Sequence, residues 1–205
     1  MNNNLNEMQQ DAIGELLNIG LGQAAAAFSE QVQQEVLLSI PNISFYTLQE
    51  ASNVLEKLIG SEACLLIQTF SGPIWGDALL ALTPQDSLEI IEILLPPHTE
   101  QERRQQEAEV LTHIGTLILS TTLKSLQSLF PDPIKMGKKQ FKKGAVYTLL
   151  DESTTTFHYR TGTALVLCMS LTLAEKKQSC YISIIMNHEA LQALKTDLDH
   201  LLNLV

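Results

Sequence analysis

Apolar residues recur at helical spacing over two long stretches of the chain. Residues 5–33 keep an apolar side that returns every three or four positions, which predicts one long helix. Residues 101–129 repeat this pattern and end before Pro131, which cannot continue a helix. The apolar side of the first helix is assigned to Leu5, Met8, Ile13, Leu16, Leu17, Ile19 and Leu21, continued by Ala24 to Ala27 and Phe28.

Shorter elements are predicted after each long helix. After the first come a strand over 36–46, a helix over 48–59, strands over 63–69 and 74–82, and a helix over 84–95. After the second come strands over 144–150, 164–173 and 180–186, with a polar turn over 174–179, and a helix over 188–204.

Local signals support several of these boundaries. Pro41 has no amide proton, so the strand that contains it should lie at a sheet edge or break there. Gly60 is a natural helix stop, and Ser71-Gly72-Pro73 makes a turn between strands. Thr83 followed by Pro84 and Asp86 is typical of a helix start.

The two halves of the chain resemble each other. Offsets of 98, 100 and 103 align residues 15–19 with 113–117, residues 64–67 with 164–167, and Leu88 with Leu191. Nearly constant offsets through helix, strand and helix indicate a duplication. We therefore expect an α/β (α+β) fold in which a single domain contains two repeats, about 1–97 and 98–205. Their long helices should pack side by side on a mainly antiparallel sheet, related by a pseudo-twofold axis.

The charge balance argues against nucleic acid as a partner. The 205 residues carry a formal net charge of −10, and an acidic chain repels a phosphate backbone. Five lysines gather between Lys135 and Lys143, but edge lysines that discourage aggregation explain them better. No run of about 18 apolar residues is present and the N-terminus lacks the features of a secretory signal, so we expect a cytoplasmic protein without membrane insertion.

Cysteine and histidine give no sign of a metal site. The three cysteines are far apart in apolar stretches, which predicts buried thiols in a reducing compartment. Four of the five histidines share no metal-ligand spacing with one another or with cysteine. The residues concerned are Cys64, Cys168 and Cys180, and His113, His158, His188 and His200.

One polar stripe on the first long helix could carry chemistry. Asp11, Glu15 and Asn18 are spaced i, i+4, i+7 and so lie within about 60° of one another. The amide offers a donor and an acceptor that can orient a water molecule, and the carboxylate can anchor a cation on a partner. The alternative is a merely solvated helix face. The small residues that follow, from Gly20 to Ala27, suit close helix packing.

Asp11-x3-Glu15-x2-Asn18, with Pro41 after 22 further residues, resembles the signature of the CheC/CheX/FliY family of chemotaxis phosphatases. The resemblance implies a CheC-like phosphatase that acts on an aspartyl-phosphorylated CheY-type response regulator. Asn18 would orient the attacking water, and Glu15 would pair with the active-site lysine of the regulator. Asp11 and Pro41 complete the pattern. The regulator would supply Mg²⁺, so no cofactor of the protein's own is implied.

The second half departs from the family pattern. Glu109, His113 and Thr116 stand where the alignment places Asp, Glu and Asn. Thr116 lacks the donor and acceptor of an amide, and His113 offers no permanent negative charge to a lysine. We therefore expect one working site, in the first half, with Glu15 and Asn18 accessible to solvent.

A second class of function stays open at this point. The same fold could serve a non-enzymatic chemotaxis or flagellar interaction protein. Its partner would be a response regulator, a CheD-type deamidase, or a switch component.

Overall fold

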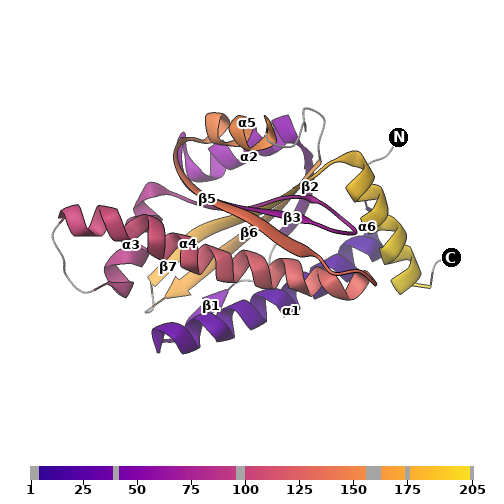
Figure 1. Cartoon of the computed structure of the whole chain (residues 1–205), viewed down its shortest axis with the longest axis horizontal. Coiled ribbons are helices and arrows are strands. Elements are labelled where there is room, and N and C mark those ends of the chain that lie inside the picture. The colour runs from indigo at the N-terminus through magenta and orange to yellow at the C-terminus, as the bar shows by residue number, and fades with distance from the viewer. Residues whose placement is uncertain (1–4, 39–41, 96–99, 156–162, 174–175, 204–205) are drawn as a thin grey trace.

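The computed structural model describes residues 5–38, 42–95, 100–155, 163–173 and 176–203 (Figure 1). The helices are α1 (Glu7–Val32), α2 (Leu48–Ile59), α3 (Pro84–Leu94), α4 (Glu100–Ser125), the short 3₁₀ helix η1 (Leu126–Leu129), α5 (Val146–Thr155) and α6 (His188–Leu201). The strands are β1 (Val36–Leu38), β2 (Asn42–Thr47), β3 (Glu62–Ser71), β4 (Gly76–Leu82), β5 (Lys135–Ala145), β6 (Thr163–Leu173) and β7 (Lys176–Met186).

In the part of the chain described, the strands form one seven-stranded sheet in the order β1-β6-β7-β4-β3-β5, with β2 also paired to β6. Every pairing is antiparallel, as the sequence predicts. Most pairings join one half of the chain to the other, including the central pair β4–β7. If β2, β3 and β4 of the first half are matched with β5, β6 and β7 of the second, the strand order β2-β6-β7-β4-β3-β5 is unchanged when the halves are exchanged and the order is reversed. The pseudo-twofold axis itself stays a prediction.

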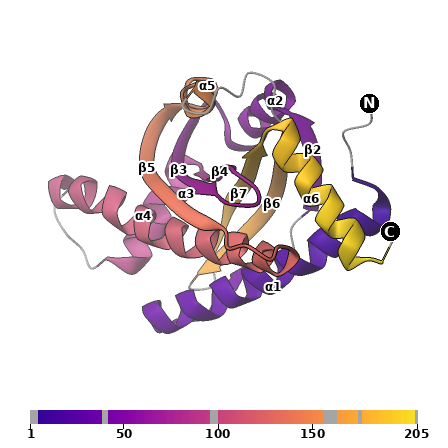
Figure 2. The ribbon, with the colours of Figure 1, turned by 45° about the vertical axis from the view of Figure 1, so that its right-hand side comes forward.

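The two long helices lie side by side on one face of the sheet, while α2 and α5 cover the other (Figures 1 and 2). Leu17 of α1 and Leu119 of α4 are fully buried in the core between the long helices and the sheet. On the opposite face, Leu55 of α2 and Leu149 of α5 pack with residues of β3 and β4. The predicted placement of the long helices is therefore confirmed.

Small residues allow α1 and α4 to approach closely. A Cβ atom added to Gly20 would lie 2.6 Å from Ser125 Oγ and 3.1 Å from the Thr121 carbonyl oxygen. Ala24, one turn further along α1, is completely buried. The predicted packing role is confirmed for these two residues. It does not extend to Gly22, which is exposed and has no atom within 4 Å of an added Cβ.

The predicted strand over 144–150 is wrong. The strand is β5, which ends at Ala145, and Val146 begins helix α5. Lysines fill β5 because it is the last strand of the sheet, so its apolar alternation is weak. Val146, Leu149 and Leu150 are all buried, and their i, i+3, i+4 spacing is helical. Gly144, with φ of 150°, lies at the change of direction between strand and helix.

The turn predicted over 174–179 is also too long. Strand β7 already begins at Lys176, and Gln178 pairs with Leu171 of β6. A hairpin needs only a short loop, and polar residues near its end still pair when the partner strand continues. Residues 174 and 175 lie outside the described part.

Other predicted boundaries are confirmed. The candidate strand over 36–46 is divided into β1 and β2, both paired to β6 at one edge of the sheet; Pro41 lies outside the described residues. Gly60 ends α2 with φ of 96°, and its N–H donates to the Glu56 carbonyl. The Thr83 hydroxyl accepts from the Asp86 amide at the start of α3. No helix in the described ranges is both long and apolar enough to cross a membrane.

Candidate functional site

The first half of α1 is held in place at its start and along its inner side. Asn6 caps the helix, and its side chain and that of Gln9 each accept from the other's backbone amide. The Gln9 side chain also donates to Asp199 Oδ1 of α6, at 2.8 Å. Ile13 and Leu17 are fully buried on the inner side. The outer side of α1 is thus presented on a firmly packed helix.

Two of the predicted site residues are open to solvent and the third is partly covered. Asp11 and Glu15 are exposed, which confirms the expected accessibility of Glu15. Asn18 is half-buried, so the expected accessibility holds for it only in part. Its carboxamide oxygen is covered and has no hydrogen-bond partner. No internal hydrogen bond therefore holds that oxygen in place, and the carboxamide group can turn without breaking one.

Two apolar residues lie beside these polar ones. The sequence assigns Met8 and Ile19 to the apolar side of the first helix, but their exposed fractions are 53% and 48%. The assignment is wrong for a geometric reason: the buried side of α1 follows Ile13, Leu17 and Leu21, and Met8 and Ile19 project away from it. We call the exposed line Met8, Asp11, Glu15, Ile19 and Gly22 the outer stripe of α1. Its spacing of three or four residues is visible in the sequence.

The strand that follows Pro41 packs near the same part of α1. A Cβ atom added to Gly14 would lie 3.5 Å from Ile43 Cδ1 of β2. Gly14 precedes Asn18 by one helical turn, so the start of β2 borders the side of α1 on which Asn18 lies. Pro41 itself is outside the described residues, and its proposed part in the motif stays a prediction.

The corresponding residues of the second half have other contacts. Glu109 and His113 are exposed, and His113 Nε2 lies 2.9 Å from Gln31 Oε1 near the end of α1. Thr116 is half-buried, and its hydroxyl oxygen is covered and without a hydrogen-bond partner. His113 is therefore engaged in a contact between the two long helices.

The two sets of residues lie at different ends of the helix pair. Gly20 faces Ser125, whereas Gln31 faces His113, so α1 and α4 run antiparallel. Asn18 therefore lies level with the end of α4, and Thr116 level with the last turns of α1. A partner that covers one set need not cover the other.

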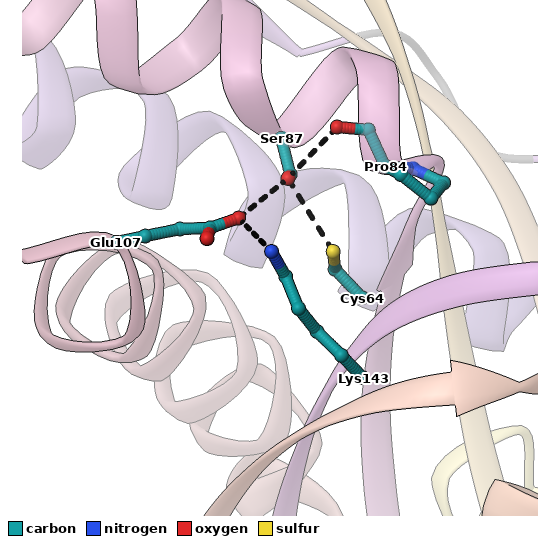
Figure 3. Close-up of polar contacts among 5 residues, drawn as sticks. All are labelled: Cys64, Pro84, Ser87, Glu107 and Lys143. Atoms are coloured by element: carbon teal, nitrogen blue, oxygen red, sulfur yellow. Dashed lines mark hydrogen bonds and ion pairs between the residues drawn. The ribbon is translucent and has the colours of Figure 1, made fainter. Parts of the chain in front are cut away.

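A polar cluster between β3, α3, α4 and β5 was not predicted from the sequence (Figure 3). Ser87 Oγ of α3 lies 3.1 Å from Glu107 Oε1 of α4 and accepts from the Cys64 thiol at 3.3 Å. Glu107 forms an ion pair with Lys143 of β5. Desolvation raises the pKa of Cys64, which keeps the thiol neutral and a poor nucleophile. The cluster thus fastens α3, α4 and β5 together.

A second polar group was also missed, within the sheet. Asp77 of β4 is completely buried, and neither carboxyl oxygen has a hydrogen-bond partner. Desolvation raises the pKa of Asp77 to about 7. It pairs with Ile185 and Thr69 on the face covered by α2 and α5, away from the long helices. Only its place in an apolar strand, Ile74 to Leu82, could have marked it in the sequence.

The predicted character of the cysteines holds where side chains are described. Cys64 and Cys180 are free and buried, and burial raises the pKa of the Cys180 thiol to about 12. The side chain of Cys168 is outside the described part. Within the described ranges, no group of three or more His, Cys, Asp or Glu side chains could hold a metal ion.

No protein-family model matches the sequence, but solved structures share its fold. FliY of Thermotoga maritima matches with a TM-score of 0.71 and 12% identity over 96% of this chain and 98% of that one. FliM in the FliG–FliM complex from H. pylori gives 0.64 and 9% over 92% and 100%. The chemotaxis protein CheX of Desulfovibrio desulfuricans gives 0.50 and 8% over 83% and 99%. The chain therefore has the CheC-like fold that these proteins share.

Proposed function

We propose that the protein is a phosphatase of an aspartyl-phosphorylated CheY-type response regulator, with one active site on the outer side of α1. The CheC-like fold and the Asp11, Glu15 and Asn18 motif support this function together. The observation that carries it is the pairing of an exposed carboxylate with a carboxamide whose oxygen has no internal partner, one turn apart on a packed helix. That arrangement positions two polar groups for another protein.

Glu15 provides the docking contact in this proposal. Its carboxylate is exposed and pairs with the active-site lysine of the regulator. Asp11 is exposed one turn earlier and adds negative charge on the same side. An exposed ion pair contributes only about 0.2–1 kcal/mol. Docking excludes water and lowers the local dielectric constant, which strengthens the attraction between Glu15 and the lysine.

Asn18 provides the catalytic contact. An amide can accept one hydrogen bond from a water and donate another, which fixes the water in line with the phosphorus atom. Phosphoryl transfer depends chiefly on positioning and charge stabilisation, so a well-placed water accounts for much of the rate. When bound, the Mg²⁺ of the regulator supplies charge neutralisation at the phosphoryl group. The phosphatase needs no metal of its own for this step, and α1 supplies the orientation.

The test is release of inorganic phosphate from an isolated CheY-type regulator that has been phosphorylated with acetyl phosphate. The wild-type protein should accelerate the release above the regulator's own rate. Asn18→Ala should remove most of this acceleration while Glu30→Ala, an exposed change near the end of α1, should leave it intact. Equal rates with and without the wild-type protein would refute the proposed activity.

A second candidate is a non-enzymatic interaction protein in the cytoplasm. The similarity to the FliM of a FliG–FliM complex, at a TM-score of 0.64 compared with 0.50 for CheX, supports this candidate. Its partner would be a response regulator, a CheD-type deamidase or a switch component. Binding to one of these without acceleration of phosphate release would support this candidate and exclude the first.

A further inference from the structure

Gly22 is an exposed glycine in the middle of a 26-residue helix, and the fold gives no reason for it. No atom lies within 4 Å of the Cβ that another residue would place there. Its φ is not in the left-handed region that favours glycine, since the positive-φ glycines described are Gly60, Gly72 and Gly144. Glycine also weakens a helix interior relative to alanine. Alanine at position 22 would therefore increase the stability of the free protein.

Gly20 shows what a glycine required by the fold looks like. A Cβ atom there would lie 2.6 Å from Ser125 Oγ and 2.8 Å from Ser125 Cβ, so the side chain is excluded by α4. At Gly22 no such neighbour exists on the described chain. Packing within the described part of the chain therefore does not account for the glycine at this position.

The position of Gly22 indicates what that neighbour is. It follows Asn18 by four residues and Glu15 by seven, so all three lie within about 60° around the helix axis. It also closes the outer stripe of α1, which holds the exposed apolar side chains of Met8 and Ile19. Two carboxylates, Asp11 and Glu15, lie between these apolar residues and suit a partner that offers a cation. A partner that covers Glu15 and Asn18 therefore covers Gly22 as well.

We propose that Gly22 is a positioning residue for the phosphatase reaction, at which the backbone of the phosphorylated regulator comes closest to α1. This inference rests on the proposed function. A side chain at position 22 holds the regulator away from the helix, so that the Asn18 carboxamide no longer reaches the attacking water. Met8 and Ile19, which are exposed on the same side of α1, add apolar contact area for the regulator.

The experiment compares Gly22→Ala and Gly22→Leu with the wild type, with Asn18→Ala and with Glu30→Leu. Glu30 is exposed on the same helix, two turns beyond Gly22, and its change tests for any general effect of an added leucine. Phosphate release from the acetyl-phosphate-treated regulator is measured over a range of regulator concentrations, together with thermal unfolding of each free variant. A misplacement of about 1 Å costs roughly a hundredfold in rate.

Gly22→Ala should raise the unfolding midpoint by roughly 2–4 °C yet lower the added phosphatase rate, and Gly22→Leu should lower that rate about a hundredfold. A residue needed only for the fold would not give a more stable and less active protein. Full activity of Gly22→Leu beside an inactive Asn18→Ala would overturn this inference and leave the proposed function standing. An inactive wild type would instead remove the proposed function on which it rests.

Discussion

Glu15 and Asn18 differ in their surroundings, and the difference matches their proposed roles. Glu15 is exposed to solvent, as a docking group should be. Asn18 is half-buried, and its carboxamide oxygen has no hydrogen-bond partner within the protein, which leaves the amide available to orient a single water. The type and spacing of these residues could be predicted from the sequence. The partial cover of Asn18 could not, because it depends on tertiary packing around α1.

The two residues should therefore differ in which kinetic quantity they change. Asn18→Ala should lower the maximal rate of dephosphorylation by a factor of roughly 10² while binding of the regulator persists. Glu15→Ala should mainly raise the regulator concentration needed for half-maximal rate, because its partner is a lysine on that protein. Steady-state phosphate release at varied regulator concentration separates the two effects.

The second-half residues serve as internal controls. Thr116→Ala should leave the maximal rate and the half-maximal regulator concentration unchanged, because a hydroxyl lacks the separate donor and acceptor groups of the Asn18 carboxamide. His113→Ala should at most loosen the contact with Gln31. If either change lowered the rate as much as Asn18→Ala does, the working site would lie in the second half instead.

Asp77 gives a prediction about stability and pH. Its pKa is raised from 3.8 to about 7 in the folded protein because burial penalises the charged form. Between these values the folded protein keeps a proton that the unfolded chain has released, so this group lowers the free energy of unfolding as pH rises. The decline begins near pH 4 and levels off above pH 7. Its total size is on the order of a few kcal/mol.

Asp77→Asn should remove this contribution. Denaturant unfolding of the variant and the wild type, measured from pH 4 to pH 8, should show a stability difference that moves in favour of the variant as pH rises. The comparison cancels the titration of other groups, because both proteins share them. Two curves that stay parallel over this range would show that the Asp77 carboxyl titrates alike in the folded and unfolded chains.

At the scale of the elements, the approach of α1 to α4 depends on Gly20. The added methyl of Gly20→Ala would meet Ser125 and the Thr121 carbonyl, and such overpacking costs about 1–3 kcal/mol. The better helix propensity of alanine returns about 1 kcal/mol, so a net loss is expected. Chemical denaturation should show it, and Ser125→Gly in the same chain should recover part of it. A Gly20→Ala protein as stable as the wild type would mean that α1 and α4 can shift apart at no cost in stability to accommodate the methyl group.

Elements with a buried and an exposed side were the most predictable. The predicted bounds of α2 match the observed ones because its apolar residues return at helical spacing and Gly60 follows its end. The structure adds a cap at its start, Thr47. Strand β5 was misplaced because its pattern is set by its position at the sheet edge, where lysines replace apolar residues. The sequence around it does not reveal which strand will be last, since that depends on pairing with β3 across the chain.

Long-range polar contacts were also out of reach of the sequence. Gln9 meets Asp199, and Ser87 meets Glu107, only after the two halves have assembled. No local spacing predicts such pairs, because the partners come from different elements. They nevertheless hold the starts of α1 and α4, so they support the candidate site from a distance.

At the scale of the whole molecule, the two halves are joined through one sheet. Strand β4 of the first half lies between β3 and β7, and β3 lies between β4 and β5, so each half completes the sheet of the other. The long helices also pack across the division. An isolated half would expose unpaired strand edges and the apolar faces that the other half covers.

Neither residues 1–97 nor residues 98–205 should therefore fold alone, whereas an equimolar mixture of the two fragments should. Each separate fragment should lack a cooperative unfolding transition in circular dichroism, because too little apolar surface is buried to offset the conformational entropy of its chain. The mixture should elute in size-exclusion chromatography as a complex of the full chain's size and regain cooperative unfolding. Cooperative unfolding of residues 1–97 alone would instead make each repeat an independent domain, and α1 with its candidate site would then not depend on the second half.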